Sequence, residues 1–254
     1  MQMQTAPVKS TLAVLNNVST LHIMVRTLLD RAPQEPGLGV FFGYSGLGKT
    51  YASTYSQNKF GAARLEVGDS WSRKYFLTAL LKELGEQDPK GSIPDLLEQA
   101  AIALDADPER PLLIDEADKL VDKKIIELVR ELHDKTGVPI VLIGEEQLPY
   151  KLQRWERVHN RVLRWEMAQP CDAEDTRALA KLWCDTLTLS DDLIEAIRRM
   201  SEGRARRIVV NLSLVEEVAR NEGVSEIDLA TFEKRVKAGQ TGWFTATPPR
   251  RGKA

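Results

Sequence analysis

Residues 43–50, which read Gly-Tyr-Ser-Gly-Leu-Gly-Lys-Thr, have the spacing of a phosphate-binding loop between an apolar segment and a helix. Its glycines let backbone N–H groups turn inward around phosphate oxygens. Lys49 supplies a charge for the β and γ phosphates, and the Thr50 hydroxyl can bind Mg²⁺ at the start of the helix. We therefore expect ATP to be bound by Gly43, Tyr44, Ser45, Gly46, Leu47, Gly48, Lys49, Thr50 and Tyr51.

Two adjacent carboxylates, Asp115 and Glu116, follow the apolar residues 112–114. An acid pair at the end of a strand is often just solvated, but here a phosphate loop precedes it. Asp115 would then hold Mg²⁺ through water, and Glu116 would polarise the attacking water for in-line transfer. The two motifs together make ATP hydrolysis chemically plausible.

Apolar and amphipathic segments alternate between residues 37 and 167, which is typical of a parallel sheet covered by helices. Helices are expected at 49–60, 73–84, after Ser92, around 125–133 and at the Arg-rich segment 148–157. Strands are expected at LGVFF, AARLEV, PLLID, VPIVLIG and VLRWEM. The pattern thus predicts an α/β fold with a five-stranded parallel sheet.

Strand signals disappear after Met167, and helical stretches are expected near 174–186, 191–201, 204–220 and 228–237. One or two further helices are expected within 10–31. We predict four parts: an N-terminal helical segment 1–35, an α/β nucleotide-binding core 36–168, a helical lid 169–239 and a basic irregular tail 240–254.

Composition excludes several classes of protein. The 35 basic and 37 acidic residues nearly cancel, so any nucleic-acid surface must be a local patch. No apolar run reaches the roughly 18 residues of a membrane span. The two cysteines lack the spacing of a zinc site. We expect a cytoplasmic protein with no membrane partner.

From about residue 20 to 235 the chain resembles the AAA+ ATPases, through the phosphate loop, the segment LLIDEADKL, the helical lid and the run 203–208. Among these it is similar to transposition regulators of the phage Mu B protein, TnsC and TniB type. Secretion-linked ExeA-type ATPases and DNA-replication initiators and loaders share much of the pattern. The resemblance implies a P-loop NTPase fold with a small helical lid subdomain.

The resemblance also implies roles for the acidic residues. Residues 43–50 look like the Walker A loop, and Asp115 with Glu116 like the Walker B pair. After the fourth strand the family usually has Asn, Thr or Ser to position the lytic water, whereas this chain has Glu145. A carboxylate there adds like charge beside Glu116 and the phosphates, so we expect slow turnover.

Two groups of arginines resemble residues that read the γ-phosphate. Arg206 corresponds to the lid arginine called sensor 2, although Arg204 or Arg207 could substitute for it. Before the fifth strand, Arg161 fits best, and Arg157 second, as the finger that reaches a neighbouring subunit's nucleotide. The alternative is that all of them are solvated surface arginines.

In the related transposition ATPases, the segment after the second strand faces the channel of a helical assembly. Here that segment spans residues 70–75, and its basic side chains would neutralise phosphates without reading sequence. Lysines that follow the acid pair could line the same channel. The expected DNA-binding residues are Ser72, Arg73, Lys74, Lys119, Lys123 and Lys124.

The resemblance thus implies an ATPase of a phage or mobile element in a bacterial host, nucleoid-associated when bound to DNA. With ATP and Mg²⁺ it would assemble into oligomers or filaments on double-stranded DNA without sequence preference and deliver that DNA to a transposase. One alternative is an ExeA-type secretion ATPase that does not bind DNA. Another is an ATP-binding assembly protein with little hydrolysis.

Overall fold

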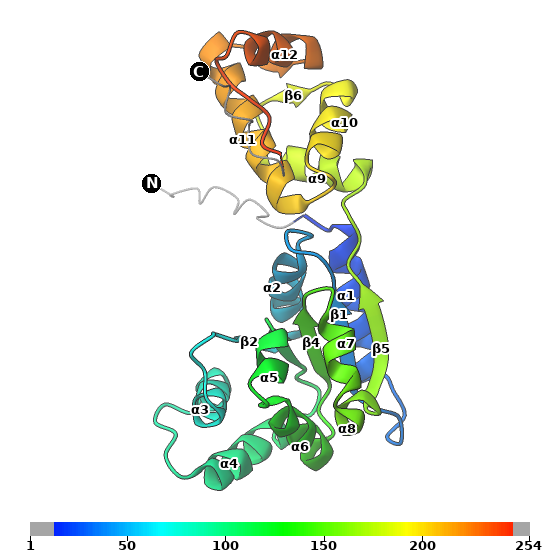
Figure 1. Cartoon of the computed structure of the whole chain (residues 1–254), viewed down its shortest axis with the longest axis vertical. Coiled ribbons are helices and arrows are strands. Elements are labelled where there is room, and N and C mark those ends of the chain that lie inside the picture. Colours follow the sequence, from blue (N-terminus) through cyan, green and yellow to red (C-terminus); the bar gives the residue numbers. More distant parts are fainter. Residues whose placement is uncertain (1–12, 246–254) are drawn as a thin grey trace, which may run out of the picture. The chain divides into compact units, whose positions relative to one another are not determined.

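The computed structural model describes residues 13–245 of the 254-residue chain (Figure 1). Contacts divide the chain into one compact unit of Asn16–Gln169 and a second that contains Pro170 and the residues after it. The last nine residues of the expected basic tail, 246–254, lie outside the described residues. None of the described helices is long and apolar enough to cross a membrane.

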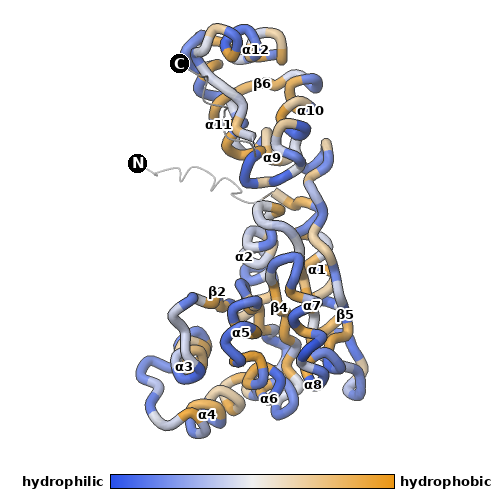
Figure 2. The backbone as a smooth tube through the Cα atoms, in the orientation of Figure 1, coloured by the Kyte–Doolittle hydropathy of each residue, from blue (hydrophilic) through white to orange (hydrophobic). Residues whose placement is uncertain are grey.

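The first unit is built on a five-stranded parallel sheet, so the expected α/β fold is confirmed. The strand order is β2-β3-β4-β1-β5. Central strands such as β4 are hydrophobic throughout, as Figure 2 shows, because helices cover both faces of the sheet. The strands are β1 (Leu38–Phe42), β2 (Ala63–Glu66), β3 (Leu112–Asp115), β4 (Ile140–Gly144) and β5 (Val162–Met167).

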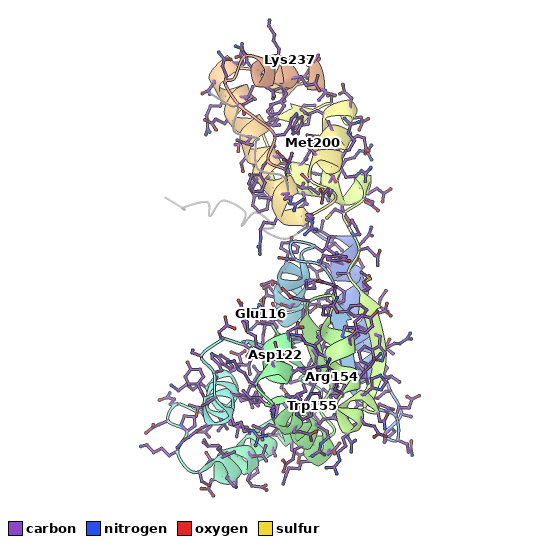
Figure 3. All side chains as sticks on the ribbon, viewed as in Figure 1. Glu116, Asp122, Arg154, Trp155, Met200 and Lys237 are labelled. Atoms are coloured by element: carbon purple, nitrogen blue, oxygen red, sulfur yellow. The ribbon has the colours of Figure 1, made fainter. Side chains whose placement is uncertain are left out.

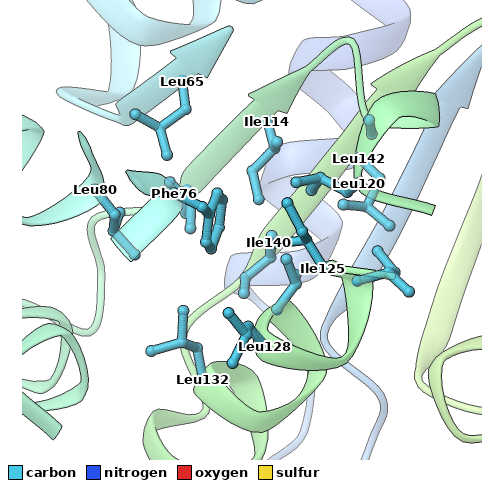
Figure 4. Packing of buried hydrophobic residues seen from close by; sticks show 14 of the residues in the cluster. Leu65, Phe76, Leu80, Ile114, Leu120, Ile125, Leu128, Leu132, Ile140 and Leu142 are labelled. Atoms are coloured by element: carbon cyan, nitrogen blue, oxygen red, sulfur yellow. The ribbon is translucent and has the colours of Figure 1, made fainter. Parts of the chain in front are cut away.

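Helices α1 (Asn16–Leu29) and α2 (Lys49–Phe60) pack on one face of this sheet. Alternate strand residues such as Leu65, Ile114 and Leu142 point to the other face, where they meet Phe76 in a buried hydrophobic cluster (Figure 4). The helices on that face are α3 (Arg73–Glu83), α4 (Ile93–Asp105), α5 (Asp118–Asp122), α6 (Ile126–Thr136), α7 (Leu148–Gln153) and α8 (Glu156–His159).

The single helix expected at 148–157 is wrong, because the chain forms α7 and α8 with a break at Arg154 and Trp155 (Figure 3). Trp155 leaves helical geometry at φ −116° and ψ 69°, and its half-buried side chain packs against the hydrophobic cluster. Packing of one large side chain thus overrides the helical periodicity of the segment. The short helix α5 was also not expected.

The second unit contains α9 (Ala173–Trp183), α10 (Asp191–Met200), α11 (Ala205–Glu222) and α12 (Leu229–Lys237), so the expected helices are confirmed. It also contains a two-stranded parallel sheet of β6 (Thr188–Leu189) and β7 (Glu226–Ile227), contrary to the expectation of helices alone. Strands of two residues are too short to show an alternating pattern in the sequence.

The start of the C-terminal tail packs onto this second unit. The buried Asn211 side chain accepts a hydrogen bond from the Phe244 N–H at 2.8 Å and donates one to the Phe244 carbonyl at 3.1 Å. Trp243 lies edge-on to Phe232, with 4.7 Å between the ring centroids. The Trp243 ring and the Phe244 backbone therefore have partners within their own chain, whereas the Phe244 side chain is exposed.

Candidate nucleotide-binding site

The phosphate loop connects β1 to α2, as its spacing predicts, and its glycines adopt backbone angles that disfavour other residues. Gly43, Gly46 and Gly48 have φ values of +156°, +85° and +86°. A Cβ atom on Gly43 would also lie 3.1 Å from the Cβ of Ala168. Glycine is therefore needed at position 43 for two reasons. The turn requires a positive φ, and Ala168, just after β5, leaves no room for a side chain.

Helix α2 begins at Lys49, directly after the left-handed Gly48. Among the described residues, no side chain caps this helix, and its first turn carries no acid. The first N–H groups of a helix have no partner within the helix and bear partial positive charge. The loop and the start of α2 therefore offer a binding site for an anion such as phosphate.

The Lys49 ammonium folds back over the loop, where it donates hydrogen bonds to the carbonyl oxygens of Gly43 at 2.6 Å and Tyr44 at 3.0 Å. Burial lowers the pKa of Lys49, and nearby carboxylates act in the opposite direction. These acids lie at or just after the carboxyl ends of β3 and β4, on the same edge of the sheet as the phosphate loop. They are Asp115, Glu145, Glu116 and Asp118.

Asp115 and Glu116 lie at the carboxyl end of β3 (Figure 3 labels Glu116). The buried Asp115 accepts a hydrogen bond at Oδ1 from the Glu116 N–H, at 3.0 Å. Glu116 has a φ of +58°, which is uncommon for a residue with a Cβ, and its side chain is 44% exposed. Such backbone outliers cluster at functional sites. Asp115 is thus fixed inside the protein while Glu116 reaches outward.

Glu145 follows β4, and β4 lies between β1 and β3 in the sheet. The carboxyl end of β4 therefore lies between the phosphate loop and the Asp115–Glu116 pair. The Glu145 N–H donates a hydrogen bond to Oδ2 of the buried Asp118 at 2.7 Å. A Cβ atom on Gly144 would come within 2.2 Å of the same oxygen. Asp118, which the sequence did not single out, thus fixes the backbone that carries Glu145.

The donor set at this edge fits Mg²⁺. Thr50 offers a hydroxyl and Asp115 a carboxylate, and both are hard oxygen ligands. In the described part of the chain no group of three or more His, Cys, Asp or Glu side chains could hold a metal ion. Mg²⁺ usually needs no such cage, because one or two protein oxygens, substrate phosphates and water complete its shell.

Asn17, on α1, is a further residue of the site that sequence reasoning missed. Its buried side chain donates hydrogen bonds to the carbonyls of Leu47 at 2.8 Å and Gln169 at 2.7 Å. Its Oδ1 accepts a third bond from the Gln169 N–H at 2.9 Å. Asn17 therefore connects Leu47 of the phosphate loop with Gln169 at the end of the first unit.

Asn17→Ala is expected to destabilise the protein by about 1–3 kcal/mol, because the buried Leu47 carbonyl loses its partner. At roughly 2–4 °C per kcal/mol, thermal melting should show this loss. Nucleotide affinity should also fall, because the loop is less constrained. The matched control is Asn58→Ala, which makes the same change at an exposed position on α2. Equal melting temperatures for the two variants would contradict the role given to Asn17.

The structure does not bring the expected arginine finger to this chain's own phosphate loop. The carbonyl of Arg161 accepts the Leu38 N–H at 2.9 Å, so Arg161 lies at the amino ends of β1 and β5, opposite the loop. Its guanidinium pairs with the Asp134 carboxylate through Nε and Nη2. Arg157, one turn earlier, is exposed. A finger at either position would have to serve another subunit.

Arg206, expected to be sensor 2, belongs to the second unit, in the first turn of α11. Arg207 and Arg204, which could take this role instead, both lie near the Glu202 carboxylate, at 3.0 Å and 3.6 Å. Arg206 itself is exposed. Its role in reading the γ-phosphate stays a prediction.

The residues expected to contact DNA lie on two segments that the fold brings together. Arg73 Nη2 donates a hydrogen bond to the Lys124 carbonyl at 2.9 Å, and Lys119 Nζ lies 3.9 Å from the Asp69 carboxylate. Lys119 also lies 3.5 Å from Glu116, at the carboxyl end of β3. Ser72 caps α3 by accepting the Tyr75 N–H at 3.2 Å, a role that was not expected.

A sequence profile of the family described as "AAA domain" matches residues 31–152. This stretch contains the phosphate loop, the acid pair and Glu145. Residues 31–152 are therefore similar to AAA domains. A comparison with curated protein sequences finds no significant match.

Solved structures share the AAA+ fold at low sequence identity. The ORC2 protein of Aeropyrum pernix in its ADP form superposes with a TM-score of 0.67 and 16% identity, covering 93% of this chain and 71% of that one. The ORC1 protein of Aeropyrum pernix in complex with DNA gives 0.60 and 16%, covering 87% and 64%. The RuvB Holliday junction branch migration motor of Thermotoga maritima gives 0.61 and 15%, covering 87% and 68%.

Proposed function

We propose that this AAA+ ATPase binds ATP with Mg²⁺, assembles on double-stranded DNA without sequence preference, and delivers that DNA to a transposase. Hydrolysis then dissolves the assembly. The carboxyl edge of the sheet supports the ATPase part, because it brings an uncapped helix start, Lys49 and the Asp115–Glu116 pair to one place. The resemblance of the sequence to transposition regulators supports the transposition part.

The observation that carries DNA binding is the basic cluster at the start of α3, formed by Arg73, Lys74, Lys123 and Lys124. All four are exposed, and the bond from Arg73 to the Lys124 carbonyl joins the two segments. A positive charge near the N-terminus of a helix is unfavourable by about 0.3–1 kcal/mol, because it adds to the positive end of the helix dipole. Phosphates of a nucleic-acid backbone would relieve this repulsion.

The comparisons add support of a general kind. Among the structural neighbours, the ORC1 protein is described in complex with DNA and RuvB as a branch migration motor. Assembly is supported by the positions of Arg161 and Arg157, which lie far from this chain's own loop. Transition-state charge on the γ-phosphate calls for an arginine, which a neighbouring subunit can lend.

Arg73→Glu combined with Lys74→Glu is expected to abolish binding to duplex DNA while leaving ATP affinity unchanged, since both residues lie outside the phosphate loop. In the parent, affinity should fall steeply with salt, because phosphate contacts release counterions. Losing two such contacts without charge reversal, as in the double alanine variant, should lower the salt slope by about two. Fluorescence anisotropy of a labelled duplex measures both effects.

The matched control is Lys82→Glu with Lys90→Glu, which makes the same change of charge at exposed positions at the end of α3 and in the loop after it. This control should bind duplex like the parent. If the two double variants bind equally well, the DNA surface lies elsewhere. A parent that hydrolyses ATP but binds no duplex would instead favour a secretion ATPase of the ExeA type.

A further inference from the structure

Arg64, in the middle of β2, is a cation held among buried groups beside the site. Its side chain is 15% exposed. Its Nη2 donates to Oδ2 of Asp115 at 3.0 Å, and its Nε donates to the Ser53 hydroxyl at 2.8 Å. The same Nη2 lies 3.3 Å from the exposed Glu66 carboxylate. One guanidinium therefore connects β3 with α2.

The strand register explains why Arg64 meets Asp115. In the parallel pair of β2 and β3, Arg64 lies opposite Leu113 and Glu66 opposite Asp115. Residues two apart in a strand point to the same face, so Arg64 and Asp115 are diagonal neighbours. Leu65 and Ile114 point to the other face, into the hydrophobic cluster. The Arg64–Asp115 face is the one that α2 covers.

Ser53 completes the connection to the phosphate-binding helix. It is fully buried, and its hydroxyl donates a hydrogen bond to the Thr50 carbonyl at 2.9 Å while it accepts the bond from Arg64. A serine hydroxyl has one donor and two acceptor positions, so both contacts can be made at once. A continuous path of hydrogen bonds thus runs from Asp115 through Arg64 and Ser53 to Thr50.

Both oxygens of Asp115 are fixed by this arrangement. Oδ2 accepts from Arg64, and Oδ1 accepts from the Glu116 N–H. The carboxylate cannot rotate without losing one of the two bonds, and the loss would leave a buried charge short of a partner. Each oxygen still has a further lone pair with which to accept a bond from water or to bind a cation.

We propose that Arg64 is the positioning residue that couples Mg²⁺ to the bound nucleotide. The two residues expected to hold the ion, Thr50 and Asp115, lie on different elements, α2 and β3. Arg64 and Ser53 set the spacing between those elements, so that one ion can be held by both residues together with the phosphates. This inference rests on the proposed ATPase function and deepens it.

The test compares the dissociation constant of fluorescently labelled ADP in EDTA with that in Mg²⁺. Arg64→Lys keeps the charge but loses the planar fork that reaches Asp115 and Ser53 together. Its affinity should weaken about tenfold in Mg²⁺, as is usual when a partner of a metal ligand is lost, and stay unchanged in EDTA. Ser53→Ala removes only a hydroxyl, so it is the variant that best keeps the fold. Ser53→Ala should also weaken ADP binding in Mg²⁺ and leave it unchanged in EDTA, but the weakening should be less than tenfold.

The matched control is Arg110→Lys, because Arg110 donates from Nε to the Gly61 carbonyl, away from Asp115. It should keep the parent's ratio of the two dissociation constants. If Arg64→Lys and Ser53→Ala also keep that ratio, or lose affinity equally in both buffers, the residues are merely structural and the inference is overturned. A parent that binds no nucleotide in either buffer overturns the proposed function, and this inference with it.

Discussion

Lys49→Ala is expected to weaken ATP binding by roughly 10- to 100-fold, because a charge-assisted contact to phosphate contributes about 1.5–3 kcal/mol. In the structure the ammonium donates to the carbonyls of Gly43 and Tyr44. The variant loses only these two bonds within the loop, so the protein should stay folded. ATP-dependent assembly should be lost. Titration with a fluorescent ATP analogue measures the affinity.

The matched control is Lys59→Ala, which removes the same side chain from an exposed position in the last turn of α2. This variant should bind ATP like the parent, and both variants should have the parent's circular dichroism spectrum. If folded Lys49→Ala binds the analogue with the parent's affinity, residues 43–50 do not bind phosphate.

Glu116→Gln is expected to lower the rate of ATP hydrolysis at least about 100-fold, since a general base usually contributes that much or more. ATP binding should persist, because the lysine, the loop and Asp115 are untouched. The Glu116 N–H still donates to Asp115 in this variant, so the backbone of the site is kept. Assemblies on DNA should consequently become long-lived. Phosphate release and nucleotide titration are measured on the same preparation.

The matched control for charge is Glu145→Gln, because both carboxylates act on the Lys49 ammonium. Removing the Glu145 charge should leave hydrolysis at least as fast as in the parent, since we assign the base to Glu116 and Glu145 adds like charge beside it. A Glu116→Gln variant that hydrolyses ATP at the parental rate would show that another group activates the water.

The sequence predicts the sheet well, because buried parallel strands such as β3 and β4 are short apolar runs between helices. The phosphate loop and acid pair are equally visible, since both chemistries depend on residue type at fixed spacing within one segment. The helix expected after Ser92 is also confirmed as α4, and the Ser92 N–H donates to the Asp95 carboxylate at 2.9 Å.

Features that depend on contacts between distant segments could not be predicted in this way. Asn17 reaches Leu47 and Gln169 only because α1 packs beside the loop. Arg64 and Glu66 have the two-residue spacing of one strand face, which is a visible signal, but their pairing with Asp115 requires the order of the strands. The break at Trp155 depends on the hydrophobic cluster that receives it.

The central claim is that one sheet edge binds ATP with Mg²⁺ and that hydrolysis there responds to DNA. The most direct test is the rate of phosphate release by the purified parent protein with ATP, measured in Mg²⁺ or EDTA and with or without duplex DNA. We expect slow release that requires Mg²⁺, rises when duplex is added, and is lost in Lys49→Ala. A folded protein that releases no phosphate under any of these conditions, or does so equally in Mg²⁺ and EDTA and without regard to DNA, would contradict this account.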